Sequence, residues 1–488
     1  MTITNLRLLE GIGQALQFIN TKTDDAYAKA LIHASSIAVD ELRIRDNGTT
    51  LPARYARGMQ LLNTLAKSAE PKFGKAVAAL PANIDVSDSW QSARAKMEKL
   101  LAVAEKLSLA KHPAAAQNTV IELFAWETEG YAFPRPPITR ATTTAITGDK
   151  VEAFVRSQGG DYADARVVAF RPLAGGFSKQ TILFDLETSK HGKESFALRG
   201  DGPVKVLGLR GQTISREYHL LRYAHAGGVL CAEPLWLNDA ETATKTKTNT
   251  LPYFISRQLP GRNIGDGITG NDDVPDSVAK SLAEAMATIH LLKIDQSNPD
   301  IQKSHLAAEG TVTQHDAQKR FIEEWTTVWF KNGRKSPIAV NAIKWVLDNV
   351  PKETTPATLV HCDCGFNNLL VNGGKISAVL DWEISHLGDP AEDIGWLMYQ
   401  IKNPDTRQRF LQYYRDAGGI AQVDAFRLKF YDVVASLKMI VAMSDIGDCF
   451  QRIPDASVHL CSYAVPYLGG PLAAVTRQIE EAEQLRGR

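Results

Sequence analysis

One stretch of the chain, Leu359–Asp393, carries the residue types that phosphoryl transfer needs. His361 and Asp363 are followed by Asn368, and Asp381 comes thirteen residues after Asn368. One carboxylate can accept the proton of an attacking hydroxyl, while an amide oxygen and a second carboxylate can hold Mg²⁺ against nucleotide phosphates. Because Asp and Asn are also common in turns, an ordinary turn is the alternative interpretation of this spacing.

Two apolar segments inside this stretch, residues 368–371 and 376–380, predict a β-hairpin. The residues between them, Asn372-Gly373-Gly374, are typical of a tight turn. Such a hairpin places Asn368 and Asp381 at its opposite edges.

Two cysteines beside the same histidine raise the alternative of a metal cluster. Cys362 and Cys364 flank Asp363 and follow His361, but too few further ligands lie nearby at the spacing of a zinc site. The five cysteines of the chain are scattered and odd in number, which favours a reduced protein over a disulfide scaffold.

Length and charge bound the class of protein. With 488 residues, two or three domains are expected. Lys plus Arg equal Asp plus Glu, 55 against 55, so the net charge favours neither nucleic acid nor a membrane surface as a partner. No run of eighteen apolar residues occurs, and Arg7 and Glu10 lie where a signal peptide would be apolar. We therefore expect a cytoplasmic protein.

A glycine-rich turn between two predicted strands is a candidate phosphate-binding loop. The strands are Val167–Leu173 and Thr181–Leu186, and the turn contains Gly175, Gly176 and Ser178. Glycines let backbone N–H groups approach phosphate oxygens without a Cβ in the way. Most Gly-Gly hairpins are only turns, so the glycines indicate a nucleotide site only in combination with charged residues later in the chain.

A third predicted strand, Ser195–Arg199, ends in an arginine, and Glu217 lies further on within the predicted helix Ser215–Ala224. A guanidinium can bind phosphate through a bidentate fork, although it is not equivalent to lysine. A solvated arginine at a strand end and an exposed helical glutamate are the alternatives.

The first part of the chain reads as helices separated by polar breaks, and prolines and threonines come after it. Prolines fix extended geometry, so this second segment is expected to be a semi-rigid linker. The predicted helices are residues 24–47, Leu51–Leu65, Trp90–Leu107 and Thr119–Thr128. The predicted domains are a helical accessory domain (1–133), a linker (134–147), a nucleotide-binding lobe (148–260) and a helical lobe with the catalytic hairpin (261–488).

From about Val151 to Tyr467 the chain resembles the aminoglycoside phosphotransferase superfamily, and within it the acyl-CoA dehydrogenase 10/11-type kinases. The motif residues that carry the resemblance are His361, Asp363, Asn368, Asp381-Trp382-Glu383 and Gly388-Asp389-Pro390-x-Glu392-Asp393. It implies an α+β protein, with a two-lobed protein-kinase-like fold preceded by a separate all-α helical bundle. One departure is Cys362, because this family usually has glycine there.

The resemblance also implies roles for individual residues. Asp363 is expected to be the catalytic base and His361 to orient its loop, while Asp393 braces that loop. The expected Mg²⁺ ligands are Asn368 and Asp381. The expected ATP-binding residues are Gly175, Gly176, Ser178, Arg199 with its partner Glu217, and the adenine-facing hinge residues Ile255 and Arg257.

These inferences predict an ATP- and Mg²⁺-dependent kinase of a small-molecule hydroxyl, and the resemblance favours a hydroxyacyl-CoA as acceptor. From residue 401 onward the chain has eleven basic and ten acidic residues, which argues against a polycationic antibiotic. Lys438 fits an anionic acceptor, although snorkelling to the surface explains it equally well.

Two other functions remain open. One is a kinase of another alcohol, such as an aminoglycoside, an amino alcohol or a sugar. The other is a non-enzymatic pseudokinase, for which Arg199 and Cys362 are the support. Around Tyr27–Arg45 the chain resembles the small helical companion proteins of bacterial hydroxyacyl-CoA kinases, which implies a fused domain that can contact a protein partner.

Overall fold

The structure is a computed structural model of the chain, and it divides into two compact units. One unit is Arg140–Glu324 with Val350–Asp432, and the other is Met1–Thr139 with Trp325–Asn349 and Val433–Arg488. The residues that the structure describes are 51–85, 88, 90–128, 146–173, 179–202, 206–209, 212–239, 251–265, 271, 273–331, 335–452 and 468–486, with positions 16, 19, 20, 32 and 35. We refer to the two units as the kinase unit and the helical unit.

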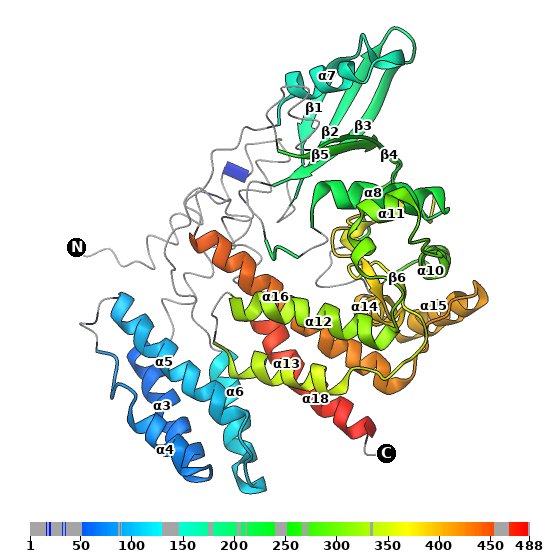
Figure 1. Cartoon of the computed structure of the whole chain (residues 1–488). Coiled ribbons are helices and arrows are strands. Elements are labelled where there is room, and N and C mark those ends of the chain that lie inside the picture. The colour runs from blue at the N-terminus through cyan, green and yellow to red at the C-terminus, as the bar shows by residue number, and fades with distance from the viewer. Residues whose placement is uncertain are drawn as a thin grey trace. The chain divides into compact units, whose positions relative to one another are not determined.

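An antiparallel sheet of five strands in the order β1-β2-β3-β5-β4 forms the first part of the kinase unit (Figure 1). The strands alternate branched, aromatic and polar residues, and this period of two suits a pleated surface. They are β1 (Arg166–Pro172), β2 (Lys179–Thr188), β3 (Gly192–Asp201), β4 (Pro234–Asn238) and β5 (Tyr253–Arg257). The strands predicted from the sequence are therefore confirmed.

Each face of this sheet is covered by a helix. Residues of α7 (Gly148–Ser157) share a buried cluster with Tyr253 and Ile255 of β5. Phe254, on the opposite face, belongs to the cluster that contains α8 (Ile214–Ala226). Thr213 caps α8, because its hydroxyl accepts the N–H of Arg216, and the first turn of this helix carries Glu217.

The second part of the kinase unit is mainly helical. Amphipathic stretches with buried Leu, Ile, Met and Ala form its core helices. The helices are α10 (Asp276–Leu291), α11 (Pro299–Lys303), the first part of α12 (Gln314–Lys331), α14 (Ala391–Gln400), α15 (Pro404–Asp416) and the first part of α16 (Ala425–Arg452). Its 3₁₀ turns are η3 (His305–Ala308) and η4 (Phe366–Asn368), whereas η2 (Gly160–Tyr162) lies between α7 and β1 in the first part.

Two small antiparallel pairs of strands lie against this helical core. β6 (Thr358–Val360) pairs with β9 (His386–Gly388), and β7 (Leu369–Asn372) pairs with β8 (Lys375–Val379). The second pair is the predicted hairpin, and both residues of its turn, Gly373 and Gly374, have positive φ.

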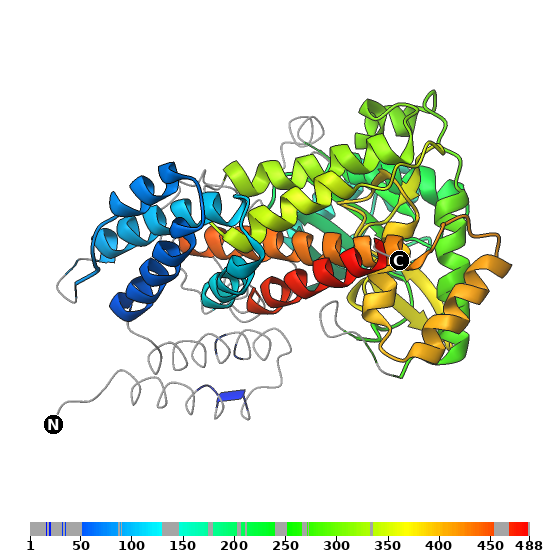
Figure 2. The same cartoon turned by 90° about the horizontal axis from the view of Figure 1, so that it is seen from below.

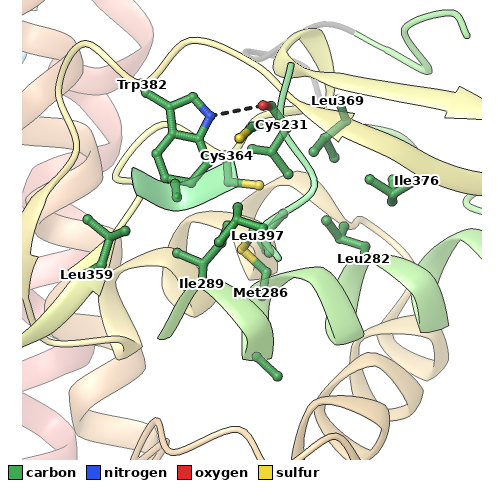
Figure 3. Packing of buried hydrophobic residues seen from close by; sticks show 14 of the residues in the cluster. Cys231, Leu282, Met286, Ile289, Leu359, Cys364, Leu369, Ile376, Trp382 and Leu397 are labelled. Carbon is green, nitrogen blue, oxygen red and sulfur yellow. Dashed lines mark hydrogen bonds between the residues drawn. The ribbon is translucent and has the colours of Figure 1, made fainter. Parts of the chain in front are cut away.

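A buried apolar cluster supports the hairpin from below (Figure 3). Trp382 packs above Cys364, and its indole N–H donates to the carbonyl of Val379 at 3.0 Å. Leu369 and Ile376 reach the same cluster from the two hairpin strands. Val379 and Trp382, before and after the Leu380-Asp381 pair, are thus fixed by burial.

The helical unit has its own apolar core, built from N-terminal helices with buried Leu, Trp and Tyr side chains. These helices are α3 (Leu51–Lys67), α4 (Pro71–Ala78), α5 (Trp90–Ser108) and α6 (Gln117–Thr128), and a 3₁₀ turn, η1 (Ala114–Ala116), precedes α6. Gly58 lets α3 approach Trp126, because a Cβ at this position would lie 2.6 Å from the indole ring. The predicted helices within 51–128 are confirmed, whereas that of 24–47 lies outside the described residues apart from positions 32 and 35.

Helices from late in the sequence belong to the same unit as these N-terminal helices. They are α13 (Pro337–Asn349), α18 (Gly469–Arg486) and the later parts of α12 and α16. α18 lies beside α13 (Figure 2), where Trp345 donates its indole N–H to Glu483 at 2.7 Å. The start of α13 binds the N-terminal helices, because Ile338 N–H donates to Glu127 at 2.8 Å and Ser336 N–H to Glu105 at 2.9 Å.

The mixed sheet and helix content confirms the predicted α+β class, and the N-terminal part of the described chain is helical, as expected. The grouping of residues 325–349 and 433–488 with that part was not anticipated, and the boundaries at 133, 147 and 260 stay predictions. Most of the predicted linker, residues 134–145, lies outside the described residues. No helix among the described residues is both long enough and apolar enough to cross a membrane.

Candidate active site

The loop after β6 is held by one buried carboxylate. Asp393, in the first turn of α14, accepts the backbone N–H of His361 and that of Cys362, each at 2.7 Å. Its Oδ2 also lies 3.1 Å from Nε2 of His290, whose Nδ1 lies 2.7 Å from the hydroxyl of Tyr414. Asp393 therefore fixes two consecutive backbone groups immediately before Asp363, as the predicted bracing role requires.

Burial acts to raise the pKa of Asp393. The hydrogen bond and charge of His290, together with His361, outweigh this effect and lower the pKa to about 2. The carboxylate is therefore ionised at neutral pH, when it can accept all three donors.

Asp363 is oriented from two sides. Its backbone N–H donates to Nδ1 of His361 at 3.3 Å, and the other ring nitrogen of His361 lies 2.9 Å from the carbonyl oxygen of Leu380. These contacts match an imidazole that donates from Nε2 and accepts at Nδ1. The amide of Asn368 donates to the carboxylate and to the carbonyl of Asp363, both at 2.9 Å.

The residue between His361 and Asp363 has an unusual backbone conformation. Cys362 has φ of +71°, a region that glycine adopts without strain. Its thiol is buried and donates to Oε1 of Glu392 at 3.4 Å. The positive φ accompanies the approach of the His361 and Cys362 N–H groups to Asp393.

Asp381 lies two residues after the end of β8, and the backbone N–H of the intervening Leu380 donates to the carbonyl of Asn368 at 2.7 Å. The hairpin thus brings the two predicted metal ligands to neighbouring backbone positions. Asp381 has φ of +65°, a strained conformation of the kind that clusters at functional sites.

The predicted ion pair between Arg199 and Glu217 is present, and the same guanidinium reaches the hairpin. Nε of Arg199 lies 2.8 Å from Glu217, although its N–H is not directed well at that oxygen, and Nη2 lies 2.5 Å from Asp381. Burial disfavours the charge of Arg199, but Asp381 and Glu217 hold its pKa above the ordinary value. Arg199 therefore joins β3, α8 and the hairpin in one charged cluster.

Two acids of this cluster are less readily ionised than usual. Burial raises the pKa of Glu383 to about 7, and the charge of Asp381 adds to the rise. Burial likewise raises the pKa of Glu217, against the lowering effect of Arg199. Perturbed acids gathered around one arginine are typical of a functional site.

Not all of the predicted site residues meet at this cluster. Ile255 lies within β5, which pairs with β3 on one side and β4 on the other, so its backbone groups lie inside the sheet. Arg257 lies at the other end of the β3–β5 ladder from Arg199 and pairs with Glu194 at 2.7 Å. Their hinge assignment stays a prediction, and the predicted loop residues Gly175, Gly176 and Ser178 lie outside the described residues.

Sequence reasoning missed a second cation of the cluster, Lys179 at the start of β2. Its ammonium lies 3.0 Å from Asp201 and 3.5 Å from Glu383. The hairpin formed by β2 and β3 sets Lys179 opposite Asp201. The turn after Thr188 sets which residues of β2 and β3 pair, so locating this turn in the sequence is the signal that could have placed Lys179 beside Asp201.

The donor set suits Mg²⁺. This ion prefers carboxylate and amide oxygens and keeps room for water and phosphate oxygens, and Asn368 and Asp381 offer such groups at adjoining positions. Within the described ranges no three or more His, Cys, Asp and Glu side chains are arranged to hold a metal by themselves. An ion bound here would therefore share its coordination with the amide of Asn368 and with the nucleotide.

Part of the chain is similar in sequence to two mouse proteins of the acyl-CoA dehydrogenase family. Acyl-CoA dehydrogenase family member 11 of Mus musculus is 25% identical over 213 residues, which are 42% of this chain and 25% of that protein. Family member 10 of the same organism is 27% identical over 188 residues, which are 38% of this chain and 16% of that protein. The chain thus spans about a quarter or less of the length of these curated relatives.

Over 67% of its length, this chain is similar to a solved structure of a thermostable variant of aminoglycoside phosphotransferase APH(4)-Ia, in complex with AMP-PNP and hygromycin B. The match covers 98% of the chain in that structure. The identity is 18% and the TM-score is 0.44. The profile of the phosphotransferase enzyme family (APH) matches residues 169–427, more than half of the sequence, and this range includes the whole charged cluster and the loop that carries His361 and Asp363. The chain belongs to the phosphotransferase enzyme family.

Proposed function

We propose that this phosphotransferase uses ATP and Mg²⁺ to phosphorylate a hydroxyl of a small molecule, and that a hydroxyacyl-CoA is the favoured acceptor. The observation that carries the proposal is the arrangement of Asp363, held by His361 and Asn368, next to a hairpin edge where Arg199 joins Glu217 and Asp381. A base, an amide oxygen, a carboxylate and a phosphate-binding cation are the parts that a kinase site needs.

The chemistry assigns a task to each residue. The acceptor oxygen attacks the γ-phosphorus and gives its proton to the carboxylate of Asp363, while the bond from phosphorus to the β–γ bridging oxygen breaks and ADP leaves. Arg199 binds the α- and β-phosphates. Asn368 and Asp381 would hold Mg²⁺, which neutralises the charge that develops on the phosphate oxygens.

Two observations support the acceptor class. The curated relatives are named acyl-CoA dehydrogenase family members 10 and 11, although this chain matches only part of each. From residue 401 onward the acidic and basic residues nearly balance, whereas a site that captures polycations is expected to be acidic. Lys438 is only 8% exposed, and its contact with an acceptor stays a prediction.

A panel of acceptors tests this assignment. The full chain is incubated with Mg-ATP and, separately, with hydroxyacyl-CoAs, the free hydroxy acids, a sugar, an amino alcohol and an aminoglycoside. We expect a mass increase of one phosphoryl group on the hydroxyacyl-CoAs. Phosphorylation of another alcohol with none of the CoA esters would contradict the acceptor class but keep the kinase.

A further inference from the structure

The ammonium of Lys179 is buried beside the nucleotide site and has three oxygen neighbours. Lys179 is 7% exposed, at the first position of β2 after the glycine-rich segment. Nζ donates to the carbonyl of Gln212 at 2.6 Å and lies 3.0 Å from Oδ1 of Asp201. The third neighbour is Glu383, whose Oε2 lies 3.5 Å away. A buried lysine at this place requires an explanation, because ordering and desolvating an ammonium is costly.

The surroundings of Lys179 repeat those of Arg199. Lys179 of β2 lies opposite Asp201 of β3, and Asp201 comes two residues after Arg199 in the same strand. The side chains of Lys179 and Arg199 therefore lie on the same face of the sheet. Each cation bridges from the sheet to the segment after β8, where Arg199 reaches Asp381 and Lys179 reaches Glu383. Each also has a second acid that anchors it.

The two acids around Lys179 hold it unequally. The distance to Asp201, 3.0 Å, is near that of a charge-assisted hydrogen bond, whereas the distance to Glu383, 3.5 Å, is longer. A lysine is a compact charge on a flexible stem, so it can keep Asp201 and exchange its more distant partner. Glu383 is therefore the neighbour that a phosphate oxygen can replace.

The acids of the cluster outnumber its cations, so a bound triphosphate depends on each of the two cations. Arg199 and Lys179 face four carboxylates, those of Glu217, Asp201, Asp381 and Glu383. A triphosphate adds further negative charge to this cluster. If Arg199 serves the α- and β-phosphates, as the proposed function has it, Lys179 is the second cation of the cluster and can act beside Mg²⁺ on the terminal phosphate.

We propose that Lys179 binds the terminal phosphate of the nucleotide, by exchanging its contact with Glu383 for a phosphate oxygen while Asp201 and the Gln212 carbonyl keep it in place. The inference rests on the proposed nucleotide-dependent function. It adds a phosphate-binding residue that distinguishes a triphosphate from a diphosphate.

Nucleotide affinities of matched variants test the inference. Lys179→Gln removes the charge and keeps a hydrogen-bond donor for the carbonyl of Gln212. The control is Lys193→Met, because Lys193 lies at the other end of β3 and its exposed ammonium lies 3.2 Å from Asp185 of β2. Dissociation constants for Mg-ATP, Mg-ADP and adenosine are measured by calorimetry on the full chain. We expect Lys179→Gln to weaken ATP binding about 10- to 100-fold and ADP binding clearly less, with adenosine unchanged. Lys193→Met is expected to leave all three unchanged.

Equal losses of affinity for ATP and ADP would show that Lys179 has a structural role only, and no loss would show that it does not contribute to nucleotide binding. Either result would overturn the inference. If the wild type binds no Mg-ATP, both the proposed function and the inference about Lys179 fail. Normal binding and turnover by both the wild type and Lys179→Gln would remove this inference alone.

A crystal structure of the wild type with Mg²⁺ and AMP-PNP decides the question even if Lys179→Gln does not fold. The expected result is the Lys179 ammonium within hydrogen-bond distance of a γ-phosphate oxygen and farther from Glu383. An ammonium that remains on Glu383, with no phosphate contact, would overturn the inference.

Discussion

Asp393 in the kinase unit and Glu127 in the helical unit are buried carboxylates that bind backbone N–H groups, but they differ in charge. Asp393 accepts two N–H groups and faces His290, whereas Glu127 accepts the N–H of Ile338 at 2.8 Å. Burial acts to raise the pKa of both acids. The donors around Asp393 lower its pKa to about 2, whereas those around Glu127 are too weak and its pKa rises to about 7. The comparison shows that hydrogen bonds and nearby positive charge, rather than burial alone, decide whether a buried acid is ionised.

Removing the carboxylate of Asp393 has the largest expected effect. In Asp393→Ala the N–H groups of His361 and Cys362 and the ring of His290 lose their acceptor. We expect a loss of about 3–5 kcal/mol in the free energy of unfolding at pH 7, measured by urea denaturation. Asp416→Ala, which changes an exposed residue of the same unit, is the control.

The pH dependence sharpens this prediction. The folded pKa of Asp393 is depressed, so its stabilising contribution is present above the unfolded pKa near 4 and is lost as the pH falls toward 2. An Asp393→Ala protein that unfolds at the same urea concentration as the wild type at pH 7 would contradict the account.

Glu127 is expected to act in the opposite direction. Its folded pKa is raised, so above the unfolded pKa near 4.5 the unfolded state releases a proton that the folded state retains. The helical unit should therefore lose stability as the pH rises from about 4.5 to 7, by about 3 kcal/mol at most. Glu127→Gln should remove this slope, which urea unfolding at several pH values measures.

Glu70→Gln is the matched control for Glu127→Gln, because Glu70 pairs with Lys72 on the exposed surface of the same unit. It should leave the slope unchanged. If Glu127→Gln keeps the full slope, Glu127 is ionised in the folded protein and the comparison with Asp393 fails.

The smallest expected effect concerns Cys362. Glycine adopts its φ of +71° without strain, so Cys362→Gly should relieve the strain while leaving the backbone N–H that binds Asp393. The lost thiol contact with Glu392 offsets part of this gain. We expect a net stabilisation of about 1 kcal/mol or less in urea denaturation. A clear destabilisation would mean that the packing of the thiol outweighs the strain.

The predictable parts of this molecule are those fixed by local patterns. The turn Gly373-Gly374 and the flanking apolar residues predict the hairpin of β7 and β8, and the alternating strands predict the sheet, because each depends on neighbours in sequence. The pair of Arg199 and Glu217 was predicted as well, although only through the family resemblance, whereas the contact of Arg199 with Asp381 was not.

The parts that could not be predicted depend on distant packing. Nothing near Glu127 in sequence indicates that it binds the start of α13, more than two hundred residues later. Helical periodicity shows which face of a helix is apolar but not which helix covers it. Lys179 was missed for a related reason, because its role depends on strand register and on Glu383.

Asp363 is proposed to be the base of a phosphoryl transfer, and its substitution tests that role directly. A metabolite extract is incubated with Mg-ATP and either the wild type or Asp363→Asn, and new phosphorylated products are followed by mass spectrometry together with ATP affinity. The account predicts a product with the wild type, at least about a 100-fold slower rate with Asp363→Asn, and unchanged ATP binding. A normal rate with Asp363→Asn would contradict the assignment of the base, and ATP binding by the wild type without any product would favour the pseudokinase.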